Sequence, residues 1–401
     1  MKAIIIIGDG MADRPLEELN FMTPLEATKV NNMNWLASNG ISGLLCSTVP
    51  ESDVANLAVF GYDPSSVYTG RGGFEAVGAG VQLSDEDLAF RCDFATINED
   101  FVVIDERAGR VREEAAELAE FLQDMRLKSF PDVELLFKQS LGFKGVLILR
   151  GEGLSANVHT SPPRLNHPAD LIWPLDGSLE AKKTCEVLRE LIRTSYILLK
   201  DHPINKKRRL LGKPMANVVI PWGVGKRPYL QPFSKKYKLR AACIAAARLI
   251  RGIAKLADMT VIDVPGATGE VDTNTRGKAE AALRALKNHD VVFVHVGGPD
   301  EASHDGDING KILIIKKIDE MVGLILENVM LEDTCLVLLA DHVTSTKLRR
   351  HTNDPAPITI AGAKVLHDGV LYFNEKAAAK GSLGKIRHLD VIPILLKIME
   401  S

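Results

Sequence analysis

The sequence predicts an α/β fold, with a mostly parallel sheet covered by helices on both faces and an inserted α+β domain. Two observations lead to this prediction. Short β-branched runs alternate with longer helical patterns in both terminal parts of the chain, as in sheets whose parallel strands are joined by helices. The middle of the chain instead alternates apolar and polar residues, which is typical of half-buried strands. A length of 401 residues is also long for one compact core.

The α/β part is expected to consist of apolar strands, each followed by a helix. Residues 3–7 are apolar without alternation, which predicts a strand buried on both faces, and residues 32–39 predict a helix after it. The same pattern returns in the C-terminal half. There the expected strands are residues 259–264, 291–296 and 336–340, and the expected helices are residues 277–287 and 311–328.

The middle of the chain has its own series of elements. In order, these are strands in 90–104, an amphipathic helix at 113–125, further strand in 136–150, an irregular loop at 157–174 and a long helix at 180–201. The loop is rich in Pro and His, which disfavour regular structure there. We therefore expect residues 72–236 to form the inserted domain, and residues 1–71 and 237–401 to form the α/β domain together.

Composition excludes several classes of protein. The formal net charge is −3, so the sequence predicts no broad basic surface for nucleic acid. No apolar stretch approaches the ~20 residues of a membrane-spanning helix, so no membrane partner is expected. The five cysteines are scattered without a Cys-x-x-Cys pair, which favours a reducing compartment over a disulfide framework or a cysteine zinc site. We expect a cytoplasmic protein.

Acidic and histidine residues follow three of the expected strands. Asp9 comes just after the first strand, Asp300 and His304 follow the strand that ends at residue 296, and Asp341 and His342 follow the strand that ends at residue 340. In open α/β sheets the ligand crevice lies at the carboxyl ends of the strands. The sequence therefore predicts that these side chains meet at one edge of the sheet.

Taken alone, each of these motifs also has an interpretation without a metal ion. Asp9 between two glycines is a common turn, and Asp300 with His304 reads equally well as a helix cap and a surface histidine. If a helix starts at Asp300, His304 lies on the same face, and a carboxylate with an imidazole suits Zn²⁺ or Mn²⁺. Asp341 and His342 are adjacent, so they would serve two different ions, or one ion from an irregular turn. His351 stands before a proline-rich segment.

Ser52 is the candidate nucleophile. The apolar spacing of Val54, Leu57 and Ala58 predicts a helix that starts at Ser52. Ser52 alone would be read as a helix cap. The same position offers free N–H groups and positive dipole potential to a phosphate, and a metal ion on the hydroxyl would lower its pKa.

The order Asp, Ser, Asp-x-x-x-His, Asp-His and His resembles the metal sites of the alkaline phosphatase superfamily. Nearly the whole chain is similar to the archaeal-type cofactor-independent phosphoglycerate mutases. The matching segments are Gly8-Asp9-Gly10 with Asp13-Arg14-Pro15-Leu16; Ser52-Asp53-Val54-Ala55-Asn56-Leu57 with Phe60-Gly61-Tyr62-Asp63-Pro64; Gly70-Arg71-Gly72 with Phe74-Glu75-Ala76; Phe90-Arg91; Arg107-Ala108-Gly109-Arg110; His202-Pro203-Ile204-Asn205; and Gly266-Ala267-Thr268-Gly269, followed by the metal motifs.

The resemblance implies a role for each matching residue. It implies two divalent ions (Mn, Zn, Co or Mg) and no 2,3-bisphosphoglycerate. One ion would be held by Asp300, His304 and His351, and the other by Asp9, Asp341, His342 and the Ser52 hydroxyl. Ser52 would carry the phosphoryl group between the two positions of phosphoglycerate. The matching arginines, Arg71, Arg107 and Arg110, suit substrate phosphate and carboxylate because guanidinium groups bind both in a bidentate way. The expected partner is this small phosphorylated metabolite, and a homo-oligomer is compatible with the sequence.

Three segments depart from the family pattern. They are Val49-Pro50-Glu51, which is shorter than the loop of relatives; Asn157-Val158-His159-Thr160-Ser161-Pro162, where relatives often have Asp-Pro-His; and Trp222-Gly223, where relatives tend to have Arg-Gly. Two alternatives to a mutase therefore stay open. One is a metal-dependent phosphatase or a small-molecule phosphotransferase, such as a homoserine-kinase-like paralogue, and the other is a metal-binding protein without catalysis.

Overall fold

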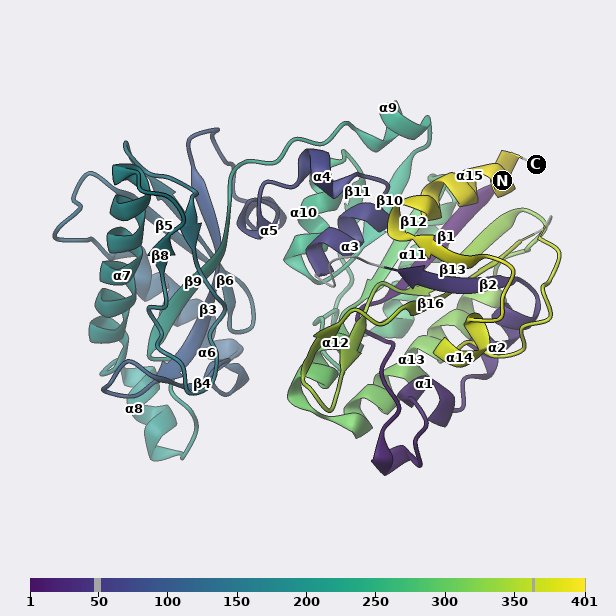
Figure 1. Ribbon diagram of the computed structural model, residues 1–401, viewed down its shortest axis with the longest axis horizontal. Helices are drawn as coiled ribbons and strands as arrows, with labels where there is room; N and C mark the ends of the chain where they lie inside the picture. Colours follow the sequence, from purple (N-terminus) through teal and green to yellow (C-terminus); the bar gives the residue numbers. More distant parts are fainter. Residues whose placement is uncertain (47–51, 363–364, 401) are drawn as a thin grey trace. The chain divides into compact units, whose positions relative to one another are not determined.

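The computed structural model describes residues 1–46, 52–362 and 365–400, and the chain divides into two compact units. The discontinuous unit comprises Met1–Val67 and Leu230–Ser401, and the inserted unit comprises Tyr68–Tyr229 (Figure 1). The limits at residues 72 and 236 that the sequence suggested for an inserted domain remain a prediction.

An eight-stranded sheet forms the centre of the discontinuous unit, in the order β11-β10-β12-β1-β13-β16-β2-β17. β16 is antiparallel to both of its neighbours, β13 and β2, and the other pairings are parallel. The strands are β1 Lys2–Gly8, β2 Ile41–Cys46, β10 Ala241–Ile244, β11 Thr260–Ile262, β12 Val291–Val296, β13 Thr334–Ala340, β16 Ala356–Ala361 and β17 Gly384–Arg387, with the separate hairpin β14 Val343–Ser345 and β15 Arg350–Thr352. The predicted fold class is confirmed.

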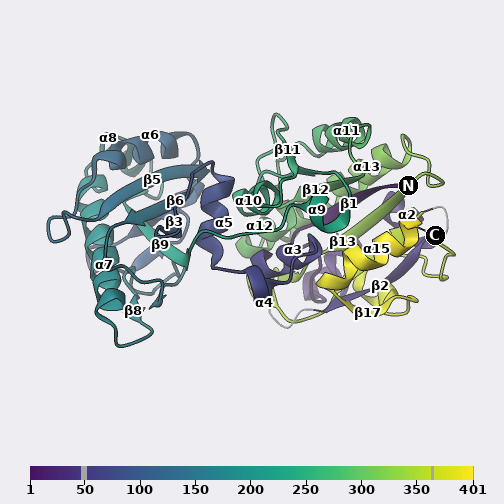
Figure 2. The ribbon, with the colours of Figure 1, turned by 90° about the horizontal axis from the view of Figure 1, so that it is seen from above.

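Helices cover both faces of this sheet (Figures 1 and 2). They are α1 Pro24–Ala27, α2 Asn31–Ser38, α3 Ser52–Val59, α4 Pro64–Val67, α9 Phe233–Tyr237, α10 Arg248–Leu256, α11 Thr275–Leu286, α12 Gly298–Asp305, α13 Ile308–Leu326, α14 Glu375–Ala378 and α15 Val391–Glu400, with 3₁₀ turns η1 Glu17–Leu19 and η4 His388–Asp390. Helices α2, α11 and α13 share a core with Ile4 and Ile6 of β1. On the opposite face Phe60, which follows α3, stacks on Phe293. Burial on both faces explains why β1 is apolar without alternation.

The inserted unit is built on an antiparallel sheet, in which β3 pairs with β4, β6 and β9, and β5 pairs with β6. Helices α6 and α7 share the main core on one face, whereas α5 packs on the other. The elements are α5 Arg71–Gly78, β3 Leu88–Ile97, β4 Val103–Asp105, η2 Ala108–Arg110, α6 Glu113–Phe121, η3 Leu122–Asp124, β5 Glu134–Leu141, β6 Lys144–Arg150, β7 Val158–His159, β8 Trp173–Pro174, α7 Leu179–Leu199, α8 Pro203–Leu210 and β9 Val218–Gly225.

Two details differ from the sequence-based prediction. The strand expected at 259–264 is shorter, Thr260–Ile262. The loop expected to be irregular at 157–174 contains a short antiparallel pair, β7 with β8, in which the rings of His159 and Trp173 stack at 3.6 Å. Prolines break the rest of this loop, as expected.

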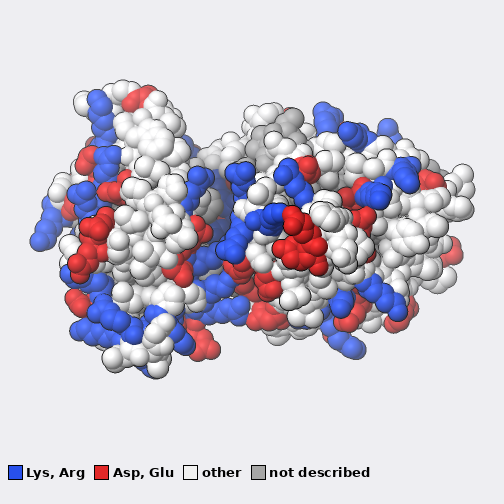
Figure 3. All heavy atoms as spheres, turned by 60° about the horizontal axis from the view of Figure 1, so that its bottom comes forward, with Lys and Arg blue, Asp and Glu red and all other residues white. Residues whose placement is uncertain are grey.

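The surface carries both signs of charge. On the face in Figure 3, Lys and Arg side chains lie beside Asp and Glu side chains on each unit. Within the described part of the chain, no helix combines the length and the apolar character needed to cross a membrane.

Candidate metal and phosphoryl-transfer site

The candidate ligands meet at the carboxyl edge of the large sheet. Asp9 directly follows β1, Asp341 and His342 directly follow β13, and α12, which begins two residues after β12, carries Asp300 and His304. Because β12, β1 and β13 are adjacent and parallel, their carboxyl ends deliver these side chains to one place. His351 reaches the same place from the β14–β15 hairpin.

The first group of donors surrounds Oδ1 of Asp300. The Nε2 atoms of His351, His342 and His304 lie 3.3, 3.4 and 3.5 Å from this oxygen. The Nε2 atoms of His304 and His351 are 3.1 Å apart. The helix α12 explains the pair Asp300 and His304, because residues four apart share one helix face, as predicted. We call Asp300, His304 and His351 the Asp300 cluster.

The second group contains Asp9, Asp341 and the other ring nitrogen of His342, and we call it the Asp9 cluster. Nδ1 of His342 lies 3.0 Å from Oδ1 of Asp341 and 3.8 Å from Oδ1 of Asp9. His342 therefore faces both clusters, one with each nitrogen. The adjacency of Asp341 and His342 is accommodated by a turn after β13, where the strand geometry has ended.

Burial and neighbouring charged groups shift the pKa values of the carboxylates in both clusters. Burial, with the neighbouring Asp341, raises the pKa of Asp9 to about 6. Burial also disfavours the charged forms of Asp341 and Asp300, but the adjacent histidines outweigh it, so both pKa values are lowered. The side-chain atoms Asp9 Oδ1, His342 Nδ1 and His342 Nε2 are buried and have no hydrogen-bond partner among the described residues. Buried carboxylates and imidazoles without partners fit divalent cations.

Ser52 is the first residue of α3 and is buried. Asn56, one turn later, links it to the Asp9 cluster. Its Nδ2 atom donates to the Ser52 carbonyl at 2.9 Å and to Oδ2 of Asp341 at 2.5 Å. The start of α3 and the Asp341 carboxylate are thus joined through one side chain. The segment Val49-Pro50-Glu51, noted for its length, lies outside the described residues.

Comparison with known proteins gives the family of the chain. A model of the metalloenzyme superfamily matches residues 1–398. The 2,3-bisphosphoglycerate-independent phosphoglycerate mutase 1 of Methanothermobacter thermautotrophicus is 44% identical over 405 residues, covering 100% of this chain and 98% of the relative. The corresponding protein of Methanocaldococcus jannaschii is 45% identical, covering 99% and 97%. The chain belongs to the 2,3-bisphosphoglycerate-independent phosphoglycerate mutases.

Solved structures agree with this family. The cofactor-independent phosphoglycerate mutase of Thermoplasma acidophilum covers 100% of both chains, with 32% identity and a TM-score of 0.62. A protein from Pyrococcus horikoshii has a TM-score of 0.80 and 35% identity, covering 100% of this chain and 97% of that one. The family predicted from the sequence is confirmed.

The arginines that the mutase resemblance singled out lie in the inserted unit. Arg71 is held by Glu75, with Nε 3.2 Å from Oε1, and its guanidinium lies 5.2 Å from the ring centroid of Trp222. Arg91 lies 5.1 Å from the same ring and forms ion pairs with Glu75 and Asp93. Trp222 donates its indole N–H to Asp93 at 2.9 Å. Trp222 is thus a platform shared by two guanidinium groups.

Arg110 is the last residue of the turn η2 of the same unit, and Arg107 is the N-cap residue of that turn. The guanidinium of Arg107 lies 5.8 Å from the ring centroid of Phe143, and the ammonium of Lys144 lies 5.3 Å from it. Arg110 donates its backbone N–H to the Arg107 carbonyl at 2.8 Å and has φ +54°. The roles of these arginines in substrate binding stay predictions.

Two residues near the clusters had not been predicted. Asn56 entered the prediction only as part of the matching segment Ser52-Asp53-Val54-Ala55-Asn56-Leu57, without a role of its own. His295 lies inside β12, where its Nε2 atom is 3.4 Å from Oδ2 of Asp9 and has no hydrogen-bond partner among the described residues. A histidine in the apolar run Val291–Val296 resembles a packing residue. The only sequence signal was its place in a strand that leads directly to Asp300.

Proposed function

We propose that this chain interconverts 3-phosphoglycerate and 2-phosphoglycerate by passing the phosphoryl group through Ser52. The observation that supports this most is the meeting of both ligand clusters at the sheet edge, with Asn56 joining the start of α3 to Asp341. An ion-binding site beside a buried serine at a helix N-terminus suits phosphoryl transfer.

The two ligand sets are part of the proposal, and they are supported by the close approach of Asp300, His342 and His351, and of Asp9, Asp341 and His342. Asp300, His304 and His351 would hold one divalent ion, and Asp9, Asp341, His342 and the Ser52 hydroxyl would hold the other. When bound, such ions neutralise phosphate charge and lower the pKa of a coordinated hydroxyl. The identity of the ions, among Mn, Zn, Co and Mg, belongs to the proposal, as does the number two.

The reaction balances without a further cofactor. Oγ of Ser52 forms a bond to phosphorus as the bond between phosphorus and the 3-oxygen of the substrate breaks, and the serine proton is transferred to that oxygen. Glycerate is retained. Its 2-hydroxyl then attacks the phosphorus, the bond to Oγ breaks, and the proton of the 2-hydroxyl returns to Ser52. The N–H groups of the first turn of α3 favour the phosphate in both steps.

Substrate recognition is assigned to the basic residues of the inserted unit. We propose that Arg71, Arg107 and Arg110 bind the carboxylate and phosphate of phosphoglycerate, because a guanidinium donates two parallel hydrogen bonds to either group. Nucleic acid and membrane are not proposed as partners, and a homo-oligomer is compatible with the proposal. The five free cysteines support a cytoplasmic location.

A phosphatase, or a phosphotransferase acting on another small metabolite, is the second candidate. One observation favours it, namely that Trp222 stands where the family resemblance places an arginine. The two candidates differ in the fate of the glycerate, which a mutase retains and a phosphatase releases together with inorganic phosphate.

An enolase-coupled assay tests the proposal. Protein loaded with Mn²⁺, Co²⁺ or Zn²⁺ should convert 3-phosphoglycerate to 2-phosphoglycerate, and acid-quenched samples should contain phosphate on the peptide with Ser52. Ser52→Ala should abolish both signals and should retain at least the ion of the Asp300 cluster. Inorganic phosphate as the main product would support the phosphatase, and no turnover with any of these ions would reject the proposal.

A further inference from the structure

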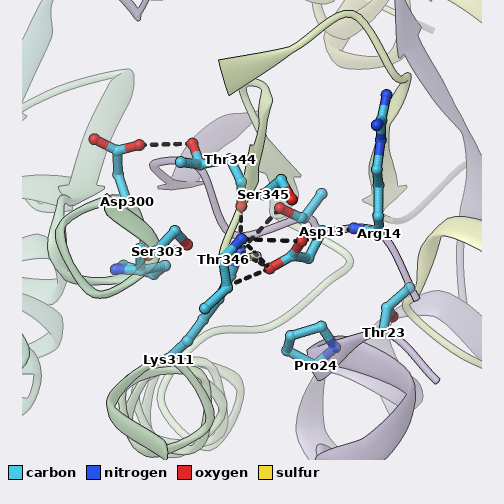
Figure 4. Close-up of polar contacts among 12 residues, drawn as sticks. Asp13, Arg14, Thr23, Pro24, Asp300, Ser303, Lys311, Thr344, Ser345 and Thr346 are labelled. Carbon is cyan, nitrogen blue, oxygen red and sulfur yellow. Dashed lines mark hydrogen bonds and ion pairs between the residues drawn. The ribbon is translucent and has the colours of Figure 1, made fainter. Parts of the chain in front are cut away.

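A threonine outside the ligand clusters contacts the carboxylate of Asp300. The hydroxyl of Thr344 donates to Oδ1 of Asp300 at 2.6 Å (Figure 4). This is the same oxygen that the three imidazole nitrogens approach. Thr344 is fully buried, so the hydroxyl is not shared with bulk solvent. A hydrogen bond to this oxygen orients the carboxylate, because it limits rotation about the bond that carries it.

Thr344 itself is held from two sides. In the β14–β15 hairpin it is the cross-strand partner of His351, so one ladder pair carries a ligand and the side chain that contacts another ligand. Its carbonyl accepts a hydrogen bond from Nζ of Lys311 at 2.9 Å. Lys311 belongs to α13, the helix that follows Asp300 and α12 in the chain.

Lys311 is a buried cation with three oxygen partners. Besides the Thr344 carbonyl, its Nζ contacts Oδ2 of Asp13 at 2.9 Å and the Ala12 carbonyl at 3.0 Å. Asp13 in turn accepts from the backbone N–H and the hydroxyl of Thr346, at 3.1 and 2.5 Å (Figure 4). The contacts of Lys311 and Asp13 therefore link three segments, namely the loop after β1, the hairpin and α13.

The position of this buried pair points to a role beyond stability. A buried ion pair commonly contributes little net stability compared with apolar residues, because both charges lose their hydration. The three segments that this pair joins each carry, or directly adjoin, residues of the two clusters. The hydroxyl of Thr344 connects this network with the site, because it donates to Asp300.

We propose that Thr344, held by Lys311 and Asp13, is a positioning residue that fixes Oδ1 of Asp300 for the ion of the Asp300 cluster. The inference rests on the proposed two-ion site. It adds a residue, Thr344, that does not bind the ion itself but positions the proposed ligand Asp300. Loss of such an outer contact typically weakens metal binding about 10- to 100-fold.

Three variants separate positioning from stability. Thr344→Val keeps the shape of the side chain and removes its donor, and Thr344→Ser keeps the donor. Thr359→Val is the matched control. Thr359 is also a fully buried strand threonine, but its hydroxyl bonds with Ser42 at 3.1 Å and with the Ile41 carbonyl, away from the clusters. Thr344→Ala serves as a second test should the valine variant fail to fold.

The measurement is calorimetric titration of metal-free protein with Mn²⁺, together with thermal unfolding and kcat. Wild-type protein should bind two ions. Thr344→Val should bind one of them about tenfold or more weakly and the other unchanged, with a lower kcat. Thr344→Ser should restore wild-type affinity. Thr359→Val should lose comparable thermal stability while keeping both affinities.

Two results would overturn the inference in distinguishable ways. If wild-type protein binds two ions and Thr344→Val binds both as tightly as Thr359→Val does, the positioning role is wrong and the two-ion site stands. If wild-type protein fails to bind two ions, the proposed function loses its site, and the role of Thr344 is lost with it.

Discussion

Nε2 of His295, in β12, lies 3.4 Å from Oδ2 of Asp9, which follows the neighbouring parallel strand β1, and this imidazole nitrogen is buried. The Asp9 carboxylate therefore has His342 near one oxygen and His295 near the other. The interaction with His295 works against the burial that raises the pKa of Asp9 to about 6.

Replacing His295 should make Asp9 harder to ionise. In His295→Phe, the pKa of Asp9 should rise above its value of about 6, so the metal-free protein should need a higher pH to take up Mn²⁺. Mn²⁺ titrations between pH 5 and pH 8 would show an upward shift of the uptake midpoint. His289→Phe, at a histidine that contacts Thr260, is the control, and an unshifted midpoint in His295→Phe would contradict the account.

Gly10 has no side chain, and the Asp300 carboxylate and the Thr344 hydroxyl lie close to it for that reason. Its backbone N–H donates to Oδ1 of Asp341 at 3.0 Å, and its φ is +56°. A Cβ there would lie 2.7 Å from Oδ1 of Asp300 and closer still to the hydroxyl of Thr344. Gly10→Ala should thus displace Asp300 and lower kcat/KM by roughly 100-fold.

Gly212→Ala provides the matched control for this substitution. Gly212 has φ +65° and no atom within 4 Å of an added Cβ, so the alanine is strained but does not collide. Both variants should lose about 1 kcal/mol of stability from the left-handed backbone. Equal activity of the two variants in the coupled assay would show that crowding at Gly10 is unimportant.

Trp222 is expected to act on substrate affinity. Removing the ring in Trp222→Leu frees the guanidinium groups of Arg71 and Arg91 from a shared surface, and we expect KM for 3-phosphoglycerate to rise about tenfold with kcat little changed. Trp222→Phe should fall between this variant and wild type. Trp35→Leu, at an exposed tryptophan, should change neither constant. A lower kcat at unchanged KM would argue against a role in binding.

Lys278 makes stability depend on pH. It is fully buried, donates to the His295 carbonyl at 2.6 Å, and has a pKa lowered by burial to about 8 from an ordinary 10.5. Between these values the unfolded chain binds the proton that the folded chain has lost, so stability rises with pH in this window. Relative to Lys278→Met, wild-type protein should gain about 2 to 3 kcal/mol between pH 7 and pH 10.

Urea unfolding at both pH values measures this difference. Groups that titrate in both proteins cancel when the variant is subtracted from wild type. Lys385→Met, at an exposed position of β17, should follow wild type at each pH. A difference between wild type and Lys278→Met that stays constant from pH 7 to pH 10 would show that Lys278 keeps an ordinary pKa.

Sequence patterns predicted the long apolar strands of the large sheet and the alternating strands of the middle of the chain, but missed several other strands of the large sheet. β1, β12 and β13 were expected within one or two residues. β10 is built of Ala241-Ala242-Cys243-Ile244, whose small residues carry little strand preference, and β16 contains Pro357 although it lies between two strands. These segments are strands because the neighbouring strands pair with them, which is information that a local pattern does not contain.

Likewise, the sequence predicted some residues of the candidate site and missed others. Residues that follow a strand, such as Asp9 and Asp341, could be placed together because parallel strands share one edge. Asn56 and His295 could not be predicted as site residues. Each lies inside an otherwise ordinary helix or strand, and each contacts the site only through a residue far away in the sequence, Asp341 or Asp9.

Anomalous diffraction from crystals soaked in Mn²⁺ tests the central claim most directly. The account predicts two peaks, one among Asp300, His304 and His351, and one among Asp9, Asp341 and His342 beside Ser52. A single peak, or peaks away from these side chains, would contradict it.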